Sequence, residues 1–553
     1  MAPIFFRDAA PGTLGRARFP SPLMTHALSV PDRLRRFAPV DISADLTTLP
    51  DTERQTLFEL VAAARLIDGL FLEQVWAGNP ALLLQLAGDR SPEGQAVLHY
   101  FLINKGPWSR LDHDEVFTPP RFDTPAKPAG ANFYPADATR EEVDGWIASL
   151  DAETRTRASG FFSVIGRDEA GRLTSVPYSV AYRNALVPIA DRLRRAAAVT
   201  TQPSLAAFLT ARADAFLSND YYASDVAWMQ IDASIEPTIG PYETYEDGWF
   251  GYKAAFEAVI AVRDAEETAK LATFGRRLQA LEDALPIDPR YRNPRLAPLS
   301  PIRVVNVVFT AGDANRGVQA AAFNLPNDDR IIREHGAKRV MLKNVQEAKF
   351  NRVLVPIADV ALAAADRARV SFDAFFSHIL LHELMHGLGP HVVYGTTQPI
   401  RLALKDAYAP IEEAKADASG LWALHQLAGA GHIPAAVAES TYATFLASAF
   451  RSIRFGVNEA HGRGVAVQLN TFVDHGAVTV AADGRFAVVP SVMPDAVAAL
   501  THDLLTIEAE GNYAAAQELL ARMGVVRPEV QRVLDRLDDV PVDIEPIFRP
   551  AGA

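Results

Sequence analysis

Two histidines and a glutamate in the stretch SHILLHELMHGLGPH have the spacing that metal chemistry requires. His382, Glu383 and His386 form an HExxH pattern, in which the two imidazoles lie one helical turn apart on the same face of a helix. Both imidazoles can then reach one ion, and Glu383 can serve as a general base on the open side of that ion. At this composition the pattern arises by chance in about 2% of chains, so we favour a zinc site over two histidines without a metal.

A catalytic zinc ion needs a third protein ligand and a water molecule, and two side chains compete for the ligand position. His391 invites comparison with the longer pattern HExxHxxGxxH, but that pattern would place its last histidine at position 392, which is a valine. Glu413, in the segment IEEAKAD, lies on a predicted second helix. We favour Glu413, because Glu412 and Asp417 on the same helix can then orient the ligand imidazoles. The alternative is that these acidic residues form a solvated helix face.

The residues that must position these side chains are predicted to be helical. Apolar residues recur at helical spacing over 372–450 and over 494–537, and Gly387, Gly389 and Pro390 should end the HExxH helix. Helices therefore carry all the expected zinc ligands.

Other elements are predicted nearer the N-terminus and beyond the zinc motif. Helical spacing indicates a helical hairpin over 52–86 and further helices over 140–150 and 177–215. The β-branched run 302–312 predicts a buried strand. Asp483-Gly484, between two short alternating runs, predicts a hairpin with a type I′ turn.

The composition is that of a folded and mildly acidic protein. The chain has 553 residues, of which 49% are hydrophobic and 22% are charged, and its formal net charge is −13. This acidic balance, without a block of Lys or Arg, argues against nucleic acid or an anionic membrane as a partner, because phosphate binding needs basic residues. The absence of cysteine excludes disulfides, iron–sulfur clusters and a cysteine nucleophile, so any metal must bind to His, Asp or Glu.

No segment of the sequence is typical of export or membrane insertion. The stretch MAPIFFRDAAPG has an apolar burst before Arg7 that is too short for the core of a signal peptide. Other apolar runs fall well short of the ~20 residues that span a bilayer. We expect a cytoplasmic monomer; a periplasmic location would require that a signal peptide had been removed.

The HExxH helix followed by an EExxAD helix resembles the dipeptidyl peptidase III family of zinc metallopeptidases, whose usual signatures are HExxGH and EExxA[ED]. HELMH has five positions where the commonest family pattern has six, and the match is to the bacterial and plant branch. Plants fuse such a domain to a Nudix hydrolase, and this sequence contains no Nudix box. The resemblance extends from about Trp228 onward and implies that His382, His386 and Glu413 bind one zinc ion.

A segment before the zinc motif carries the same resemblance. The sequence IGPYETYED at 239–247 is similar to the family segment that holds the free amino terminus of the substrate. This resemblance implies that Glu243 and Glu257 bind the substrate ammonium and that Tyr245 donates a hydrogen bond near the scissile carbonyl. The alternative for this segment is an aromatic-rich surface turn.

Two shorter matches complete the resemblance. Asn324 and Asn327 in NLPN resemble the N-x-P-N turn of the family, whose Asn side chains hold the substrate backbone, although NLPN can also form an Asx turn without a ligand. His461 in the sequence EAH resembles the histidine that stabilises the tetrahedral intermediate, whereas a lone histidine is more often structural.

The family resemblance also implies a fold, which is α+β with two lobes around a wide cleft. Residues 265–303 with 353–522 are expected to form a mostly helical lobe that bears the zinc. Residues 1–264 with 304–352 and 523–553 are expected to form a mixed lobe with a β-barrel core that binds the substrate amino terminus.

These residues together predict a zinc exopeptidase that releases dipeptides from the free N-terminus of short peptides. Glu383 would take a proton from the attacking water and pass it to the leaving amine, while the zinc, Tyr245 and His461 would stabilise the oxyanion. Two alternatives stay open. One is a zinc endopeptidase of the thermolysin type, without an ammonium site, and the other is a slow or inactive peptide-binding protein on the same fold.

Overall fold

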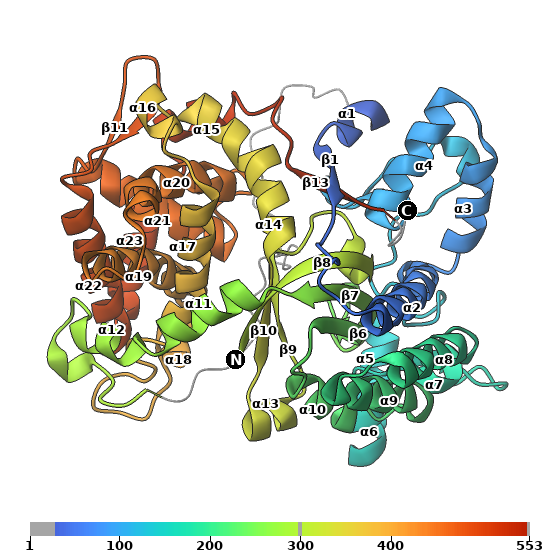
Figure 1. Cartoon of the computed structure of the whole chain (residues 1–553). Coiled ribbons are helices and arrows are strands. Elements are labelled where there is room, and N and C mark those ends of the chain that lie inside the picture. Colours follow the sequence, from blue (N-terminus) through green and yellow to red (C-terminus); the bar gives the residue numbers. More distant parts are fainter. Residues whose placement is uncertain (1–27, 297–300, 550–553) are drawn as a thin grey trace. The chain divides into compact units, whose positions relative to one another are not determined.

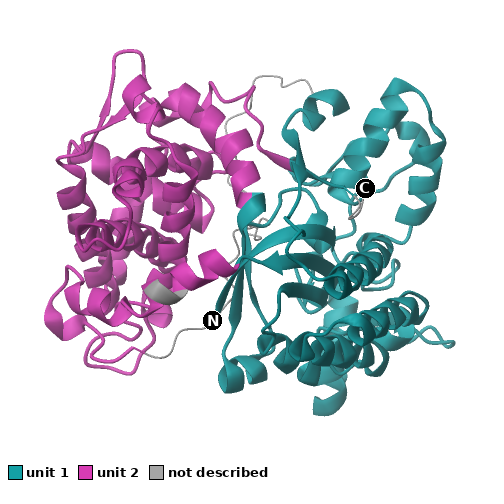
Figure 2. Cartoon of the chain, viewed as in Figure 1, with its two compact units in different colours: residues 1–264, 300–345, 545–553 teal, residues 265–299, 346–544 magenta. Residues whose placement is uncertain are grey.

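The computed structural model describes residues 28–296 and 301–549, which form two compact units (Figure 2). Unit 1 consists of residues 1–264, 300–345 and 545–553, and unit 2 consists of residues 265–299 and 346–544. The stretch MAPIFFRDAAPG, whose short apolar burst argues against a signal peptide, lies outside the described residues.

The core of unit 1 is a five-stranded sheet in the order β6-β7-β8-β10-β9. Strands β8 and β10 are parallel, and the other neighbouring strands are antiparallel. The sheet is open and curled like half a barrel. It corresponds to the β-barrel core expected for the mixed lobe. Helix α2 packs against β7 and β8 (Figure 1), and the residues of β6 and β7 are almost all buried. The strands are β6 (Ile235–Glu243), β7 (Ala255–Arg263), β8 (Ile302–Gly312), β9 (Ala322–Leu325) and β10 (Lys338–Leu342).

Outside this sheet the described residues form helices, four pairs of short strands and the loops that connect them. The helices of unit 1 are α1 (Val30–Leu34), α2 (Asp51–Val75), α3 (Asn79–Gly88), α4 (Pro92–Asn104), α5 (Arg140–Ser149), α6 (Ala152–Ala158), α7 (Tyr178–Ala181), α8 (Arg183–Val199), α9 (Pro203–Ser218), α10 (Tyr222–Met229) and α13 (Asp329–His335). The paired short strands are β1 (Phe37–Ile42) with β13 (Asp543–Phe548), β2 (Trp108–Ser109) with β3 (Glu115–Val116), β4 (Ser163–Arg167) with β5 (Leu173–Pro177), and, in unit 2, β11 (Val478–Val480) with β12 (Phe486–Val488).

Most elements predicted from residue patterns are present in the structure. Helices α2 and α3 correspond to the predicted pair over 52–86, and β8 covers the predicted strand. The region 177–215 is divided into α7, α8 and α9, and α9 begins at Pro203, in the first-turn position that proline favours.

Unit 2 is almost entirely helical, as the apolar periodicity of its sequence predicts. Helix α17 packs on α19 and α20, and α19 in turn packs on α21 and α22 (Figure 1). Helix α14 (Lys343–Lys349), which crosses from unit 1, continues through a π-helical turn into α15. The helices of unit 2 are α11 (Ala265–Gly275), α12 (Leu278–Ala284), α15 (Val355–Ala361), α16 (Ala364–Arg367), α17 (Phe372–Met385), α18 (Ile400–Leu404), α19 (Tyr408–Gly429), α20 (Ala435–Ile453), α21 (Ala460–Asp474), α22 (Met493–Glu510), α23 (Tyr513–Met523) and α24 (Pro528–Leu534).

The boundaries of the units differ from those expected for the lobes. Residues 301–303 belong to unit 1, whereas 346–352 and 523–544 belong to unit 2. Hydrogen bonds within unit 2 explain why the segment 523–544 belongs to it. Asn470 of α21 donates to the carbonyls of Met523 and Val525 at 2.7 and 2.9 Å, contacts that no local sequence pattern reveals.

The hairpin of β11 and β12 forms as expected, but its turn is not of type I′. A type I′ turn needs two consecutive residues with positive φ. Gly484 has a φ of 76°, whereas Asp483 is not among the described residues with positive φ. The turn is closed by a hydrogen bond from Gly484 N to Ala481 O, and the loop is longer than two residues.

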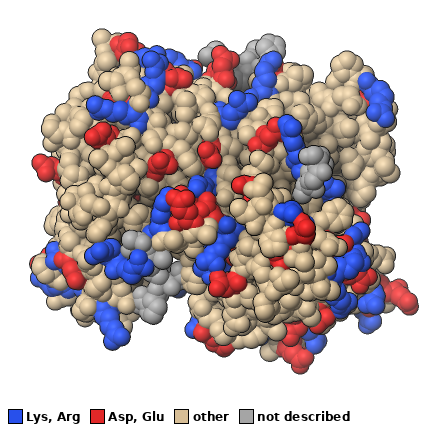
Figure 3. Space-filling model, viewed as in Figure 1, with Lys and Arg blue, Asp and Glu red and all other residues tan. Residues whose placement is uncertain are grey.

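No helix among the described residues is long and apolar enough to cross a membrane. On the face shown in Figure 3, Lys and Arg side chains are interspersed with Asp and Glu.

Candidate active site

The HExxH residues stand at the buried C-terminal end of α17. This helix is apolar around its circumference and packs in the core of unit 2, so its last turn is held on several sides. His382 and Glu383 are 2% and 4% exposed, and His386 is the C-cap residue of the helix.

Small residues bring the neighbouring helices close to this end of α17. A Cβ atom added to Gly420 of α19 would lie 3.1 Å from the backbone nitrogen of His382. A Cβ added to Gly464 of α21 would lie 3.0 Å from the backbone nitrogen of Ala414. Gly420 therefore allows α19 to lie close to α17, and Gly464 allows α21 to lie close to α19 next to Glu413.

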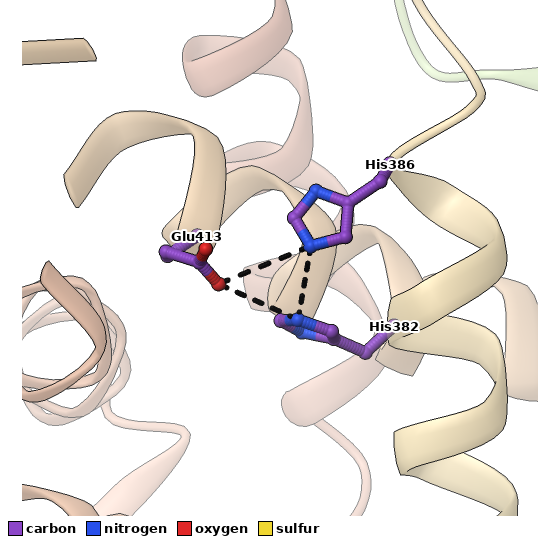
Figure 4. Close-up of side chains that lie close together, drawn as sticks. All are labelled: His382, His386 and Glu413. Atoms are coloured by element: carbon purple, nitrogen blue, oxygen red, sulfur yellow. Dashed lines mark hydrogen bonds and ion pairs between the residues drawn. The ribbon is translucent and has the colours of Figure 1, made fainter. Parts of the chain in front are cut away.

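The side chains of His382, His386 and Glu413 are turned toward one point (Figure 4). His382 Nε2 lies 3.1 Å from His386 Nε2 and 3.4 Å from Glu413 Oε2, and His386 Nε2 lies 3.9 Å from Glu413 Oε2. Ligand atoms bound at ~2.0–2.1 Å around a tetrahedral zinc ion are roughly 3.3 Å apart, and the three separations bracket this value. The group therefore fits a metal ion with three protein ligands and one open position.

Two further carboxylates hold the opposite nitrogens of the histidines. His382 Nδ1 lies 3.2 Å from Asp417 Oδ1, and His386 Nδ1 lies 2.7 Å from Glu412 Oε1. Because an ionised carboxylate only accepts hydrogen bonds, each Nδ1 carries a proton. In the neutral imidazoles, the form that binds a metal, each Nε2 then presents a lone pair, and the two nitrogens lie 3.1 Å apart, close enough to bind one cation.

The charges around the group favour a bound cation. Burial alone would raise the pKa of Asp417, but His378 and the hydrogen bonds from His382 and Gln468 lower it to about 2. Burial likewise opposes ionisation of Glu413, yet the neighbouring His461 and His382 hold the pKa of this carboxyl well below its usual range. Both carboxylates are therefore ionised at neutral pH.

His461 is next to this group but is not one of its three converging members. It lies on α21, and its Nε2 is 3.0 Å from Glu413 Oε2 with 30% of the side chain exposed. An imidazole that is partly open to solvent beside a metal ligand can donate a hydrogen bond to a bound substrate.

His391, the other candidate for third ligand, is exposed and lies after the end of α17. Its Nε2 is 3.3 Å from Gly387 O. Among the described residues, the group whose ligand atoms converge closely enough to hold a metal ion contains Glu413 and not His391.

The residues expected to bind the substrate amino terminus lie in unit 1. Glu243 is the last residue of β6 and Glu257 is on β7, and they are 3% and 4% exposed. A β-bulge puts two residues of β6, Tyr242 and Glu243, opposite Ala255, so the chain carries Glu243 alongside the strand that bears Glu257. The backbone partners of Glu257 are Gly240 on β6 and Gly312 on β8, and neither places a side chain next to it.

The loop after β6 presents Tyr245 while burying its neighbours. Tyr245 is 41% exposed, whereas Glu246 is buried and forms ion pairs with Arg110 at 2.5 Å and Arg316 at 3.3 Å. Asp247 accepts hydrogen bonds from four backbone nitrogens of the same loop. These two acidic residues fix the loop that carries Tyr245.

The NLPN segment is joined to the end of β6. Asn327 Nδ2 donates to Tyr242 O at 2.8 Å, one residue before Glu243, and Asn324 is on β9, opposite Arg339 of β10. Both Asn side chains are half-buried. Within unit 1 the structure therefore brings Asn327 to the part of β6 that carries Glu243.

Comparisons with known proteins point to one family. The sequence profile of peptidase family M49 matches residues 166–417, a range that includes HELMH and EEAKAD. The solved structure of dipeptidyl-peptidase III from Corallococcus sp. strain EGB is 58% identical in sequence and covers 94% of this chain and 97% of its own, with a TM-score of 0.77. The chain belongs to peptidase family M49, the dipeptidyl peptidase III family.

Two further relatives agree with this assignment. Dipeptidyl peptidase III from Caldithrix abyssi is 43% identical, with a TM-score of 0.89, and the match covers 94% of this chain and 98% of that structure. A protein of Arabidopsis thaliana named Nudix hydrolase 3 is 40% identical over 578 residues, which are 95% of this chain and 75% of that protein. As a member of family M49 the chain is a peptidase, and peptides are its substrates.

Three residues of this M49 peptidase support the metal group but were not predicted from the sequence. His378 Nε2 lies 3.0 Å from Asp417 O, and Gln468 donates to Asp417 Oδ2 at 2.9 Å. Lys415 lies 2.9 Å from Glu412 Oε1. The spacing of His378, four residues before His382 on the same helix face, is a signal that could have found it. Lys415 and Gln468 have no comparable signal, because their contacts depend on how the helices pack.

Proposed function

We propose that this M49 peptidase is a zinc-dependent exopeptidase that releases dipeptides from the free amino terminus of short peptides. One observation carries the proposal: ligand atoms of His382, His386 and Glu413 lie within 4.8 Å of one another, and Glu383 follows the first ligand on the same helix. The relationship to two dipeptidyl peptidase III structures supports dipeptides as the product.

His382, His386 and Glu413 would hold one zinc ion per chain, with Asp417 and Glu412 orienting the imidazoles. When bound, zinc would supply Lewis acidity, which lowers the pKa of a water molecule toward ~7 and polarises the peptide carbonyl.

The protein's own side chains would carry out the proton transfers. Glu383 accepts a proton from the attacking water and delivers it to the nitrogen of the leaving amine. His461, whose Nε2 lies 3.0 Å from Glu413 Oε2, donates a hydrogen bond to the oxyanion, and Tyr245 is assigned the same task.

The acidic pair in unit 1 would define where the substrate begins. Glu243 and Glu257 are buried carboxylates on neighbouring strands, and two ionised carboxylates attract a cation. The substrate ammonium would be that cation, and Asn324 and Asn327 would bind the peptide backbone. In this proposal unit 2 carries the metal and unit 1 binds the amino terminus.

The products of peptide hydrolysis test the proposal. Zinc-loaded protein is incubated with a mixture of short peptides, and the products are identified by mass spectrometry. We expect dipeptides from the amino terminus of each cleaved peptide. Cleavage at internal bonds would instead indicate an endopeptidase, and zinc-loaded protein that binds peptides without cleaving them would indicate a peptide-binding protein.

A further inference from the structure

Lys415 is a buried cation that the proposed reaction does not use. It lies on α19, two residues after Glu413, and its side chain is 1% exposed. Its ammonium group donates to the carbonyls of Met385 at 3.2 Å and Leu388 at 3.3 Å, and lies 2.9 Å from Glu412 Oε1. An ammonium group has three N–H donors, so each of them has an acceptor here.

One of these acceptors, Met385 O, belongs to the last residue of the helix that carries His382, and another, Leu388 O, lies in the turn that follows it. Helix α17 ends at Met385, and His386 is its C-cap residue. Just beyond it the backbone tightens, with hydrogen bonds from Gly387 N to Leu384 O and from Leu388 N to Met385 O. The last carbonyls of a helix lack partners within the helix, and this turn frays most easily. His386, one of the proposed ligands, is therefore at the position where hydrogen bonds within the helix restrain the backbone least.

The third acceptor connects Lys415 to the imidazole of His386. Glu412 Oε1 lies 2.7 Å from His386 Nδ1 and 2.9 Å from Lys415 Nζ. One ammonium group thus contacts both the backbone around His386 and the carboxylate that orients its ring.

We propose that Lys415 is a positioning residue of the metal site, which keeps the Nε2 of His386 turned toward His382 and Glu413. The inference rests on the proposed zinc site and adds a residue that touches neither zinc nor substrate. Held only by the frayed end of α17, the ring of His386 would sample orientations that do not bind the metal, and zinc affinity would fall.

Lys253 of unit 1 provides a matched control for the loss of a buried lysine. Its side chain is also fully buried, and its ammonium group donates to Ala158 O, Gly160 O and Ser163 Oγ at 2.5, 3.0 and 3.0 Å. Unit 1 contains none of the three residues of the metal group. Lys253→Met should therefore lower stability without changing the metal site.

The test is the zinc dissociation constant, measured by competition with a chromophoric chelator, alongside urea unfolding of the metal-free proteins. We expect Lys415→Met to weaken zinc binding by roughly 10–100-fold and Lys253→Met to leave it within about twofold of the parent. Unchanged zinc affinity in Lys415→Met, or an equal loss in both variants, would overturn the inference. If the parent protein itself binds no zinc, the proposed function is wrong. If the parent binds zinc and Lys415→Met binds it equally well, only the role of Lys415 is wrong.

A double-mutant cycle with Glu412→Gln tests the route of the effect. If Lys415 acts through Glu412, the double variant should lose much less affinity than the sum of the two single losses. Independent, additive losses would contradict this route. Lys415→Gln, which keeps a donor but no charge, replaces Lys415→Met if that variant does not fold, and parental affinity in it would equally overturn the inference.

Discussion

Glu383 is the residue whose substitution separates chemistry from metal binding. It is buried beside the ligand His382 but is not part of the converging metal group. We predict that Glu383→Gln keeps the fold and one zinc per chain, while kcat falls by at least ~10²-fold, because the variant loses the base and not a ligand. Zinc content and kcat are measured on the same preparation. Near-parental turnover would show that another group accepts the proton.

The choice of third ligand makes a separate prediction at the same scale. Glu413→Ala should lose most zinc affinity, because Glu413 Oε2 completes the group with both histidines, whereas His391→Ala should keep it. The zinc affinity of Asp417→Asn should lie between them, at roughly 10–100-fold weaker binding than the parent, because the variant loses the carboxylate that orients His382 but keeps all three ligands. The zinc dissociation constants of the three variants, measured by competition with a chelator, give the order of their affinities. Loss of zinc from His391→Ala would move the ligand assignment away from Glu413.

Zinc binding should also depend on pH through His382. Burial by itself lowers the pKa of His382, but hydrogen bonds to Asp417 and Glu413 outweigh it and raise this pKa to about 10 in the metal-free protein. His382 therefore carries an extra proton at neutral pH, and zinc must displace it. We predict that zinc affinity rises about tenfold per pH unit between pH 7 and 9 and falls as the pH is lowered. A zinc dissociation constant independent of pH over this range would contradict the protonated state of His382.

At the scale of elements, the close approach of α17 and α19 depends on Gly420. An alanine there would put its Cβ 3.1 Å from the backbone nitrogen of His382, and the two helices would have to separate. Overpacking of this kind costs about 1–3 kcal/mol, more than the ~0.5–1 kcal/mol that alanine gains over glycine in a helix. We predict that Gly420→Ala lowers both the free energy of unfolding and, by roughly tenfold, the zinc affinity. Gly429→Ala is the control, because a Cβ added at this end of the same helix meets no atom within 4 Å. Equal effects of the two substitutions would show that the contact does not position His382.

How much the sequence reveals depends on whether a feature is local to one element. His382, Glu383 and His386 share one helical turn, so their spacing alone predicts their arrangement, and the EEAKAD spacing does the same for Glu412, Glu413 and Asp417. Contacts between different elements cannot be predicted from spacing in this way. The carbonyls that Lys415 binds are 27 and 30 residues away in sequence, and no periodicity marks the pair.

The strands and the turn show the same limit. The β-branched run predicts β8, but the bulge that carries Glu243 alongside β7 arises from pairing between two strands and leaves no mark in either sequence. The hairpin of β11 and β12 was predicted with the wrong turn type, because Asp-Gly also suits a longer loop in which only glycine has positive φ.

At the scale of the whole molecule, the two units have separate tasks in the proposed function. Unit 2 holds the metal group on α17 and α19, and unit 1 holds the acidic pair Glu243 and Glu257 on its sheet. Family membership makes the chain a peptidase. We propose in addition that the acidic pair recognises a free amino terminus, which would make the enzyme an exopeptidase.

The most direct test of this claim compares kcat/KM for two peptides that differ only in acetylation of the amino terminus, on the parent and on Glu243→Gln. We predict that the parent strongly prefers the free terminus, since an acetylated one brings no charge to the buried carboxylates. Glu243→Gln should raise KM for the free peptide, at a cost of roughly 2–5 kcal/mol, and should discriminate less between the two peptides while keeping its zinc. Equal kcat/KM values for the acetylated and free peptides on the parent enzyme would contradict the ammonium site and leave a zinc endopeptidase.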